Sequence, residues 1–166
     1  MAQTVEQLAQ SFRHELKATP GPGGRRRVCE LLQKALRDPA FIAATFNVST
    51  PERQLLHEDP ELGFCILAHY NQDAKHGAPH DHGPSWAIYG QAAGETQMTD
   101  WDVVEPASAD QPGKVRHRRT YKLAPGQVHL YNEGDVHSPS RAAPTRLLRI
   151  EGTNLERVRR RKYEII

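Results

Sequence analysis

The sequence of 166 residues contains only two cysteines, carries a net charge of +2, and has no hydrophobic run long enough to span a bilayer. Cys29 and Cys65 form neither a CxxC pair nor another metal-clip spacing, which argues against a disulfide-stabilised or zinc-ribbon domain. The N-terminus also lacks a basic stretch followed by an apolar run, so we expect no secretory signal. These absences predict a cytoplasmic protein that does not bind membranes.

A small net charge also argues against a polyanionic partner. Basic clusters occur at residues 25–27, 116–119 and 157–162, but no aromatic side chains are interleaved with them, as a single-strand binder would need. Nucleic acid is therefore not an expected partner. With 37% hydrophobic and 25% charged residues, the composition is that of a globular protein, and we expect one domain over residues 1–166.

The first 46 residues are predicted to be helical. In residues 4–17 the apolar positions recur at helical spacing behind Thr4, a suitable N-cap. A Pro/Gly segment at residues 18–24 breaks the pattern, and a second helical stretch then runs to Asp38-Pro39. A short third helix over residues 40–46 completes the predicted helical cap.

The remainder, residues 50–166, has the character of a β-barrel. Short runs rich in β-branched and aromatic residues alternate with Gly, Pro, Asn and Asp, which indicates an all-β sandwich or barrel. The runs are 64–70, 84–90, 96–104, 114–123, 127–132, 146–152 and 161–166. A mainly β fold with an N-terminal helical cap is therefore predicted.

The histidines give the main indication of function, and the most informative pair is His80 and His82. Residues two apart in an extended strand project to the same face, so both imidazoles can bind one metal ion, whereas Asp81 faces away. Two histidines bind weakly, so another strand must supply a third ligand. His129 and His137 are both candidates on this reasoning, and the remaining histidines, His69 among them, are expected to be structural or at the surface.

These motifs resemble the cupin superfamily, and within it the cysteine dioxygenase (thiol dioxygenase) group. The first cupin motif is matched by HDHGPSWAIYGQAAGET, with Gly90 at the place of the glycine that closes the hairpin, and the second by Pro125-Gly126 and a later histidine. The resemblance implies a cupin double-stranded β-helix (jelly-roll barrel) and favours His137 over His129. Many cupins add a glutamate after the HxH pair, but Trp86 and Ala87 stand there, so no carboxylate ligand is implied.

The same resemblance implies further site residues. Arg53 matches the family's carboxylate-binding arginine, while Arg149 and Glu151 occupy the places where thiol dioxygenases carry a histidine and a tyrosine. We expect Arg149 and Glu151 to contact the substrate or each other if their face is buried, and to form a solvent-facing salt bridge if it is not. The candidate pocket walls are Tyr70, Trp86, Tyr131 and His129.

The resemblance implies an Fe(II)-dependent dioxygenase that uses O2 and acts on a small carboxylate-bearing substrate. In this family the substrate also carries a thiol. Zn, Mn or Ni are alternative metals. A non-oxidative metal-dependent isomerase or lyase, and a binding module without catalysis, are the competing functions. A homodimer formed through edge strands is a further expectation.

Overall fold

The computed structural model describes residues 3–47 and 51–166, and three helices come first along the chain. Thr4 caps the first helix as predicted: its hydroxyl accepts from the Gln7 amide at 3.2 Å, and the Gln7 side chain accepts from the Thr4 amide at 2.9 Å. Pro22 occupies the first turn of the second helix, where its missing N–H has no helical partner to lose. The helices are α1 (Val5–Ala18), α2 (Pro22–Ala35) and α3 (Pro39–Thr45).

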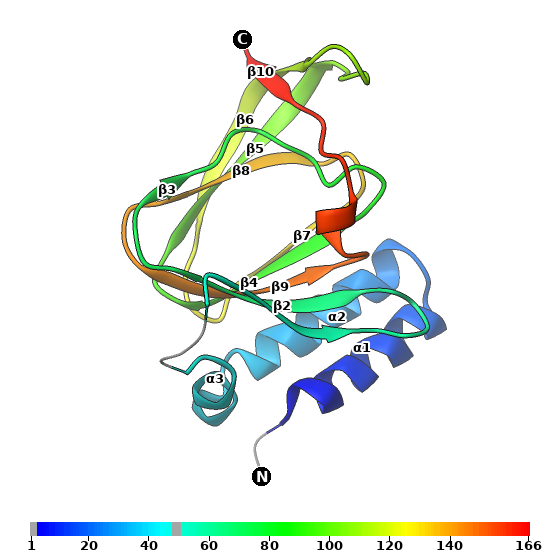
Figure 1. The fold of residues 1–166 in the computed structure, drawn as a ribbon, viewed down its shortest axis with the longest axis vertical. Helices are drawn as coiled ribbons and strands as arrows, with labels where there is room; N and C mark the ends of the chain where they lie inside the picture. Colours follow the sequence, from blue (N-terminus) through cyan, green and yellow to red (C-terminus); the bar gives the residue numbers. More distant parts are fainter. Residues whose placement is uncertain (1–2, 48–50) are drawn as a thin grey trace.

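Over residues 51–166 the structure has ten strands, which form two five-stranded sheets that face each other (Figure 1). The first sheet has the order β1-β2-β9-β4-β7, and the second has the order β10-β6-β5-β8-β3. All pairings are antiparallel except that of β10 with β6. The strands are β1 (Arg53–Glu58), β2 (Cys65–Asn71), β3 (Lys75–His76), β4 (Ala87–Ala93), β5 (Thr96–Glu105), β6 (Gly113–Leu123), β7 (Val128–Tyr131), β8 (Val136–Arg141), β9 (Thr145–Glu151) and β10 (Tyr163–Ile165).

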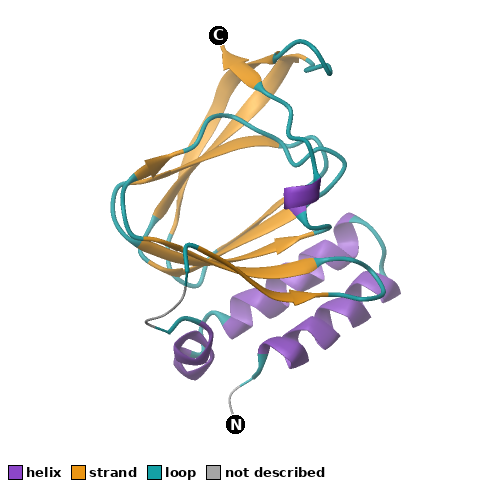
Figure 2. Ribbon diagram, viewed as in Figure 1, coloured by secondary structure: helices purple, strands orange, loops and turns teal. Residues whose placement is uncertain are grey.

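The main core lies between the helices and the outer face of the first sheet (Figure 2). Strand β9 shows how the sequence assigns its two faces, because Leu148 and Ile150 pack into this helix-covered core. Leu147 belongs instead to a second cluster inside the barrel, with Tyr89 and Tyr131. Alternation along a strand therefore turns Arg149 and Glu151 into the barrel as well. The predicted mainly β double-stranded β-helix with its helical cap is confirmed.

Several local predictions were wrong. Helix α2 begins at Pro22, inside the segment predicted to be a break, because a proline at the first position of a helix does not interrupt it. Gly90 lies in the middle of β4 rather than at the hairpin, which turns instead at Gly94 with φ of +69°. A Cβ at Gly90 would lie 2.6 Å from Leu36 Cδ1, so this glycine lets α2 approach the sheet.

Three strands, β1, β3 and β8, were not predicted. Each has a sequence without strict apolar alternation, and β8 contains Pro139. The C-terminal segment after β9 includes a short 3₁₀ helix, η1 (Leu155–Arg157), and runs across the open side of the barrel to β10 (Figure 1). No helix in the described ranges is long and apolar enough to cross a membrane.

Candidate metal centre and adjoining cavity

A pair of backbone hydrogen bonds brings two of the candidate ligands together. The His80 amide donates to the His137 carbonyl and the His137 amide donates to the His80 carbonyl, each at 3.0 Å. His137 lies in β8, and His80 lies in the loop before β4, where it forms isolated bridges with His137 and with Lys162. The prediction that His80 and His82 share one regular strand was wrong, yet both side chains reach the same point.

His82 follows in a tight loop. Asp81 faces away from the imidazoles, as predicted, and its carboxylate accepts hydrogen bonds from the Gly83 amide at 3.0 Å and from the Tyr163 hydroxyl at 2.8 Å. Gly83 has φ of +59°, a left-handed conformation that suits glycine. Asp81 thereby fixes the loop and ties it to the C-terminal segment.

The three imidazoles form a compact cluster. Their potential ligand atoms all lie within 4.8 Å of one another, and His82 and His137 are fully buried. The ring centroid of His137 lies 4.6 Å from that of His80 and 4.7 Å from that of His82. These three histidines could hold a metal ion.

The protonation of the cluster suits a metal. Because a carbonyl can only accept, Nδ1–H of His80 donates to the Ala78 carbonyl at 2.9 Å, and Nδ1–H of His137 donates to the Asp135 carbonyl at 3.2 Å. Both Nε2 atoms are then unprotonated, and each can serve as a metal ligand. Burial lowers the pKa of His80 to about 4 and that of His82 to about 2, so the imidazoles are neutral at physiological pH.

Two buried atoms of the cluster lack a partner within the described chain. His80 Nε2 and His82 Nδ1 make no hydrogen bond, although buried polar atoms in proteins nearly always make one. A bound divalent ion would give His80 Nε2 a partner. His82 faces Tyr89 and His137 through Nε2, so its orphaned Nδ1 is a separate atom that the ion does not explain. The donor set and the orphaned Nε2 of His80 fit a metal.

Tyr89 also belongs to the cluster, and the sequence analysis missed it. Its hydroxyl lies 3.2 Å from His137 Nε2, to which it donates, and 3.3 Å from His82 Nε2. Tyr89 is the neighbour of Arg149 across β4 and β9, so it shares the inward face of the sheet. The register of these two strands, which a sequence does not display, was the signal that could have found it.

Tyr131 and His129 lie behind the cluster. Tyr131 stacks on His137 with a centroid distance of 3.8 Å, and its hydroxyl donates to Asp100 at 3.2 Å and pairs with the Tyr121 hydroxyl. His129 contacts Tyr131 and Tyr121, with centroids 4.6 Å and 5.0 Å away. His129, the alternative third ligand, is thus separated from the cluster by the Tyr131 ring.

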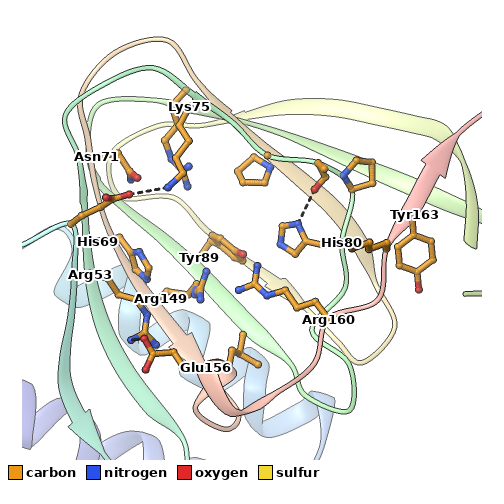
Figure 3. Close-up of a pocket in the computed structure, with 18 of the residues that line it drawn as sticks. Arg53, His69, Asn71, Lys75, His80, Tyr89, Arg149, Glu156, Arg160 and Tyr163 are labelled. Atoms are coloured by element: carbon orange, nitrogen blue, oxygen red, sulfur yellow. Dashed lines mark hydrogen bonds and ion pairs between the residues drawn. The ribbon is translucent and has the colours of Figure 1, made fainter. Parts of the chain in front are cut away.

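The cluster opens into a cavity of about 860 Å³. His80 and Tyr89 contribute to its lining, and Figure 3 shows the side chains that converge on it. Seven of its lining residues are cationic and two are carboxylates; the cations are Arg53, Lys75, Arg141, Arg149, Arg160, Arg161 and Lys162, and the carboxylates are Glu52 and Glu156. The size is that of a small-molecule site, and the charge favours an anionic occupant.

Arg149 and Glu151 form an ion pair beside this cavity. Arg149 Nε donates to Glu151 Oε1 at 2.7 Å, and Glu151 Oε2 accepts from the Leu155 amide at 2.9 Å. The Glu151 side chain is fully buried and that of Arg149 is 11% exposed. The alternative of a solvent-facing salt bridge is therefore wrong, and Glu151 is engaged with the protein rather than facing the cavity.

Arg53 lines the cavity, but half of its guanidinium is committed elsewhere. Its Nη1 donates to Glu156 Oε1 at 2.8 Å, and its Nη2 lies 3.8 Å from Glu151 Oε2. The Nη2 atom is buried and makes no hydrogen bond in the described part of the chain. Arg53 thus has one free donor for a ligand.

Tyr70 and Trp86 were expected to be pocket walls and do not line this cavity. Tyr70 lies under Arg146, with the guanidinium carbon 5.1 Å from its ring centroid, on the face of β2 opposite His69. Trp86 packs in the helix-covered core beneath Arg25. Tyr131 and His129 line a separate hollow on the far side of the cluster.

Comparison with known proteins shows likeness at the level of three-dimensional structure. No protein-family model matches the chain, and no curated protein matches it significantly. Among solved structures, KdgF from Halomonas sp. matches with a TM-score of 0.44 and 13% identity, over 60% of this chain and 74% of that one. The DMSP lyase DddQ from Ruegeria pomeroyi matches with a TM-score of 0.43 and 16% identity, over 61% of this chain and 44% of that one.

A cupin superfamily protein from Desulfitobacterium hafniense matches similarly, with a TM-score of 0.44 and 14% identity over 59% of this chain and 72% of that one. One of these neighbours is named as a cupin superfamily protein and another as a DMSP lyase. At such identities and scores the likeness gives no support for a shared substrate or reaction.

Proposed function

We propose that this chain is a metal-dependent enzyme in which His80, His82 and His137 hold one divalent ion and the adjoining cavity binds a small anionic substrate. The observation that carries the proposal is the convergence of three neutral imidazoles, one of them with an orphaned buried Nε2, beside a cationic cavity that His80 lines. Neutral ligands leave the positive charge of a bound ion undiminished, which favours anionic substrates.

The finer proposal is an Fe(II)-dependent dioxygenase that acts on a small carboxylate-bearing substrate, with a thiol as the first donor group to test. Fe(II) bound by three imidazoles would supply redox chemistry with O2 and keep positions open for a substrate. The arginines of the cavity would orient the substrate's carboxylate, since guanidinium groups bind carboxylates through two hydrogen bonds.

Tyr89 would handle a proton in this reaction. Its hydroxyl lies 3.2 Å from His137 Nε2, beside the place that the ion would occupy. A substrate donor atom next to the ion could gain a proton from this hydroxyl or lose one to it. Thiol dioxygenases use a tyrosine of the late strand, where this chain has Glu151; Tyr89 would supply a phenol from the neighbouring strand β4.

The same hydroxyl favours a second candidate, a non-oxidative isomerase or lyase. In that reaction a metal ion acts as a Lewis acid, and Tyr89 serves as a general acid or base without O2. The cytoplasmic location and the homodimer stay predictions under either candidate.

The test begins with metal content. Protein purified from rich medium, and protein reconstituted with Fe(II) without oxygen, are analysed for bound metal, and O2 uptake is then followed with a panel of small thiol acids. We expect one ion per chain, and its loss in His82→Ala with the circular dichroism spectrum retained, because the core and not the ion supplies most of the stability. His14→Ala, on the surface of α1, is the matched control.

The outcomes separate the candidates. Iron with thiol-dependent O2 uptake supports the dioxygenase, whereas zinc or manganese without O2 uptake supports the non-oxidative enzyme. Full metal occupancy in His82→Ala would refute the assignment of the centre.

A further inference from the structure

Orphaned polar atoms gather around the cavity. In the described residues, six buried side-chain nitrogen atoms lack a hydrogen bond, and four of them belong to residues that line this one cavity. These are Arg53 Nη2, His69 Nε2, His80 Nε2 and Arg141 Nε. His80 Nε2 is an acceptor and would face the ion, whereas the nitrogens of Arg53, His69 and Arg141 can donate. Since buried polar atoms are nearly always satisfied, these three favour a ligand with several acceptor atoms.

Of these four residues, Arg141 has the strongest need for a ligand, because it carries a buried charge. The residue is only 7% exposed, and no carboxylate in the described ranges pairs with it. A buried charge without a counter-ion destabilises the folded state strongly. Burial lowers the pKa of Arg141, and the charge of Arg149 also lowers it. A ligand anion would compensate that charge.

Other cations of the cavity already have partners within the protein. Lys75 pairs with Glu52 at 2.8 Å, and Arg149 pairs with Glu151. Burial and the nearby arginines hold the pKa of His69 down at about 2, so His69 is neutral and can donate one hydrogen bond without adding charge. Arg160, Arg161 and Lys162 also lack an ion pair within the described chain, but all three are exposed to solvent. The buried charge of the cavity without a counter-ion is therefore that of Arg141.

This cationic region lies away from the metal centre. His69 and Arg53 are directly paired across β1 and β2, and Arg141 is paired with Lys75 across β8 and β3. In Figure 3, His69 and Lys75 lie on the side of the cavity opposite His80, and Tyr89 and Arg149 lie between the two sides. The cavity therefore offers two sites for negative groups, one at each side.

We infer that the substrate is a small acid with two anionic groups, one facing the histidine cluster and the other an oxyanion bound by Arg141 and His69. This inference rests on the proposed metal-dependent function, and it adds to it a second charge on the substrate. A ligand with a single carboxylate at the metal would leave Arg141 uncompensated, whereas a dianion satisfies both sides at once. The second group is a carboxylate or a phosphonate-like oxyanion, because both present acceptor oxygens to a guanidinium.

The test uses three probes of similar length: butanoate, succinate and 3-phosphonopropanoate. Their affinities for cobalt-loaded protein are measured by titration calorimetry, and cobalt occupancy is read separately from the visible spectrum. We expect succinate or 3-phosphonopropanoate to bind at least tenfold more tightly than butanoate, and the tighter of the two identifies the oxyanion.

Arg141→Met should remove this preference, and His69→Ala should weaken it, which keeps the test open if one variant folds poorly. Arg146→Ala is the matched control, because Arg146 lies over Tyr70 outside the cavity. Equal affinities for all three probes, or a preference that survives in Arg141→Met, would overturn the inference.

The two proposals fail in different ways. Normal cobalt occupancy without a preference for dianions removes the second anionic site and leaves the metal centre intact. A preference for dianions in protein that binds no cobalt supports the Arg141 site and removes the metal-dependent function.

Discussion

Replacing Glu151 by glutamine should destabilise the protein strongly, although the side chain keeps its shape. The fully buried carboxylate accepts from Arg149 Nε at 2.7 Å and from the Leu155 amide at 2.9 Å. Glutamine retains an acceptor oxygen but loses the charge, so Arg149 is left as a buried cation without a counter-ion. Breaking a buried pair in this way costs about 3 to 5 kcal/mol, and we expect the lower end because Arg149 keeps 11% of its side chain exposed.

Two further variants separate the interaction energy of the Arg149–Glu151 pair from the contributions of the single side chains. Arg149→Met should cost a similar amount, about 3 kcal/mol, since it leaves the Glu151 carboxylate buried. The double variant Arg149→Met with Glu151→Leu replaces both charges by apolar groups, and such replacements are often neutral. We therefore expect the double variant to lose less stability than the sum of the single variants by at least about 2 kcal/mol.

The measurement is the free energy of unfolding in urea at pH 7, followed by far-ultraviolet circular dichroism. Chelator is present throughout, because a bound metal would stabilise the folded state by mass action and obscure the difference. The free energy of unfolding of such a domain is about 5 to 15 kcal/mol, so a loss of about 3 kcal/mol clearly lowers the urea concentration at the midpoint of unfolding. Single losses below about 1 kcal/mol, or additive losses in the double variant, would refute the reasoning.

Three further predictions concern the cluster, the cavity and the sheet. Tyr89→Phe removes only the hydroxyl near the imidazoles, so metal occupancy should be unchanged while turnover falls about a hundredfold, and parental turnover would exclude a proton-handling role. The lowered pKa of His69 makes the folded state bind fewer protons than the unfolded state below pH 6.5, so stability should fall as the pH drops from 7 to 5; His69→Asn should reduce that fall by about 1 to 2 kcal/mol in urea titrations, and an unchanged pH dependence would count against it. Gly90→Ala places a Cβ 2.6 Å from Leu36 Cδ1, so it should lower the free energy of unfolding by about 1 to 3 kcal/mol without affecting metal occupancy. Thermal unfolding measures this loss. An unchanged melting temperature would show that the helix shifts to accept the methyl group without cost.

Much of this architecture follows from local patterns in the sequence. The apolar spacing before Ala18 and the Thr4 cap predict the first helix, and the β-rich runs after Gly63 predict the barrel. Strand β8 was not predicted because its sequence lacks local alternation. Pairing with β5 and β3 holds it in extended form. Pro139 fits there since a strand tolerates proline where its N–H is not required.

The site was only partly predictable for a similar reason. His80 and His82 are conspicuous because they are close in sequence, whereas Tyr89 and Arg141 depend on how strands far apart in sequence are aligned. The inward position of Arg149 could not be decided from its own strand, because Leu147 and Leu148 are both apolar and lie on opposite faces. Only the pairing with neighbouring strands and the covering helices assigns the faces.

The reciprocal backbone hydrogen bonds between His80 and His137 have a consequence for redesign of the coordination sphere. Because amide and carbonyl groups hold these two positions, each at 3.0 Å, their spacing does not depend on which side chain they carry. His80→Asp should then exchange one imidazole for a carboxylate on an unchanged frame, giving the two-histidine, one-carboxylate set typical of many iron oxygenases. Such an exchange also lowers the charge of the loaded centre by one, so affinity for anions in the adjoining cavity would fall while the barrel stays the same.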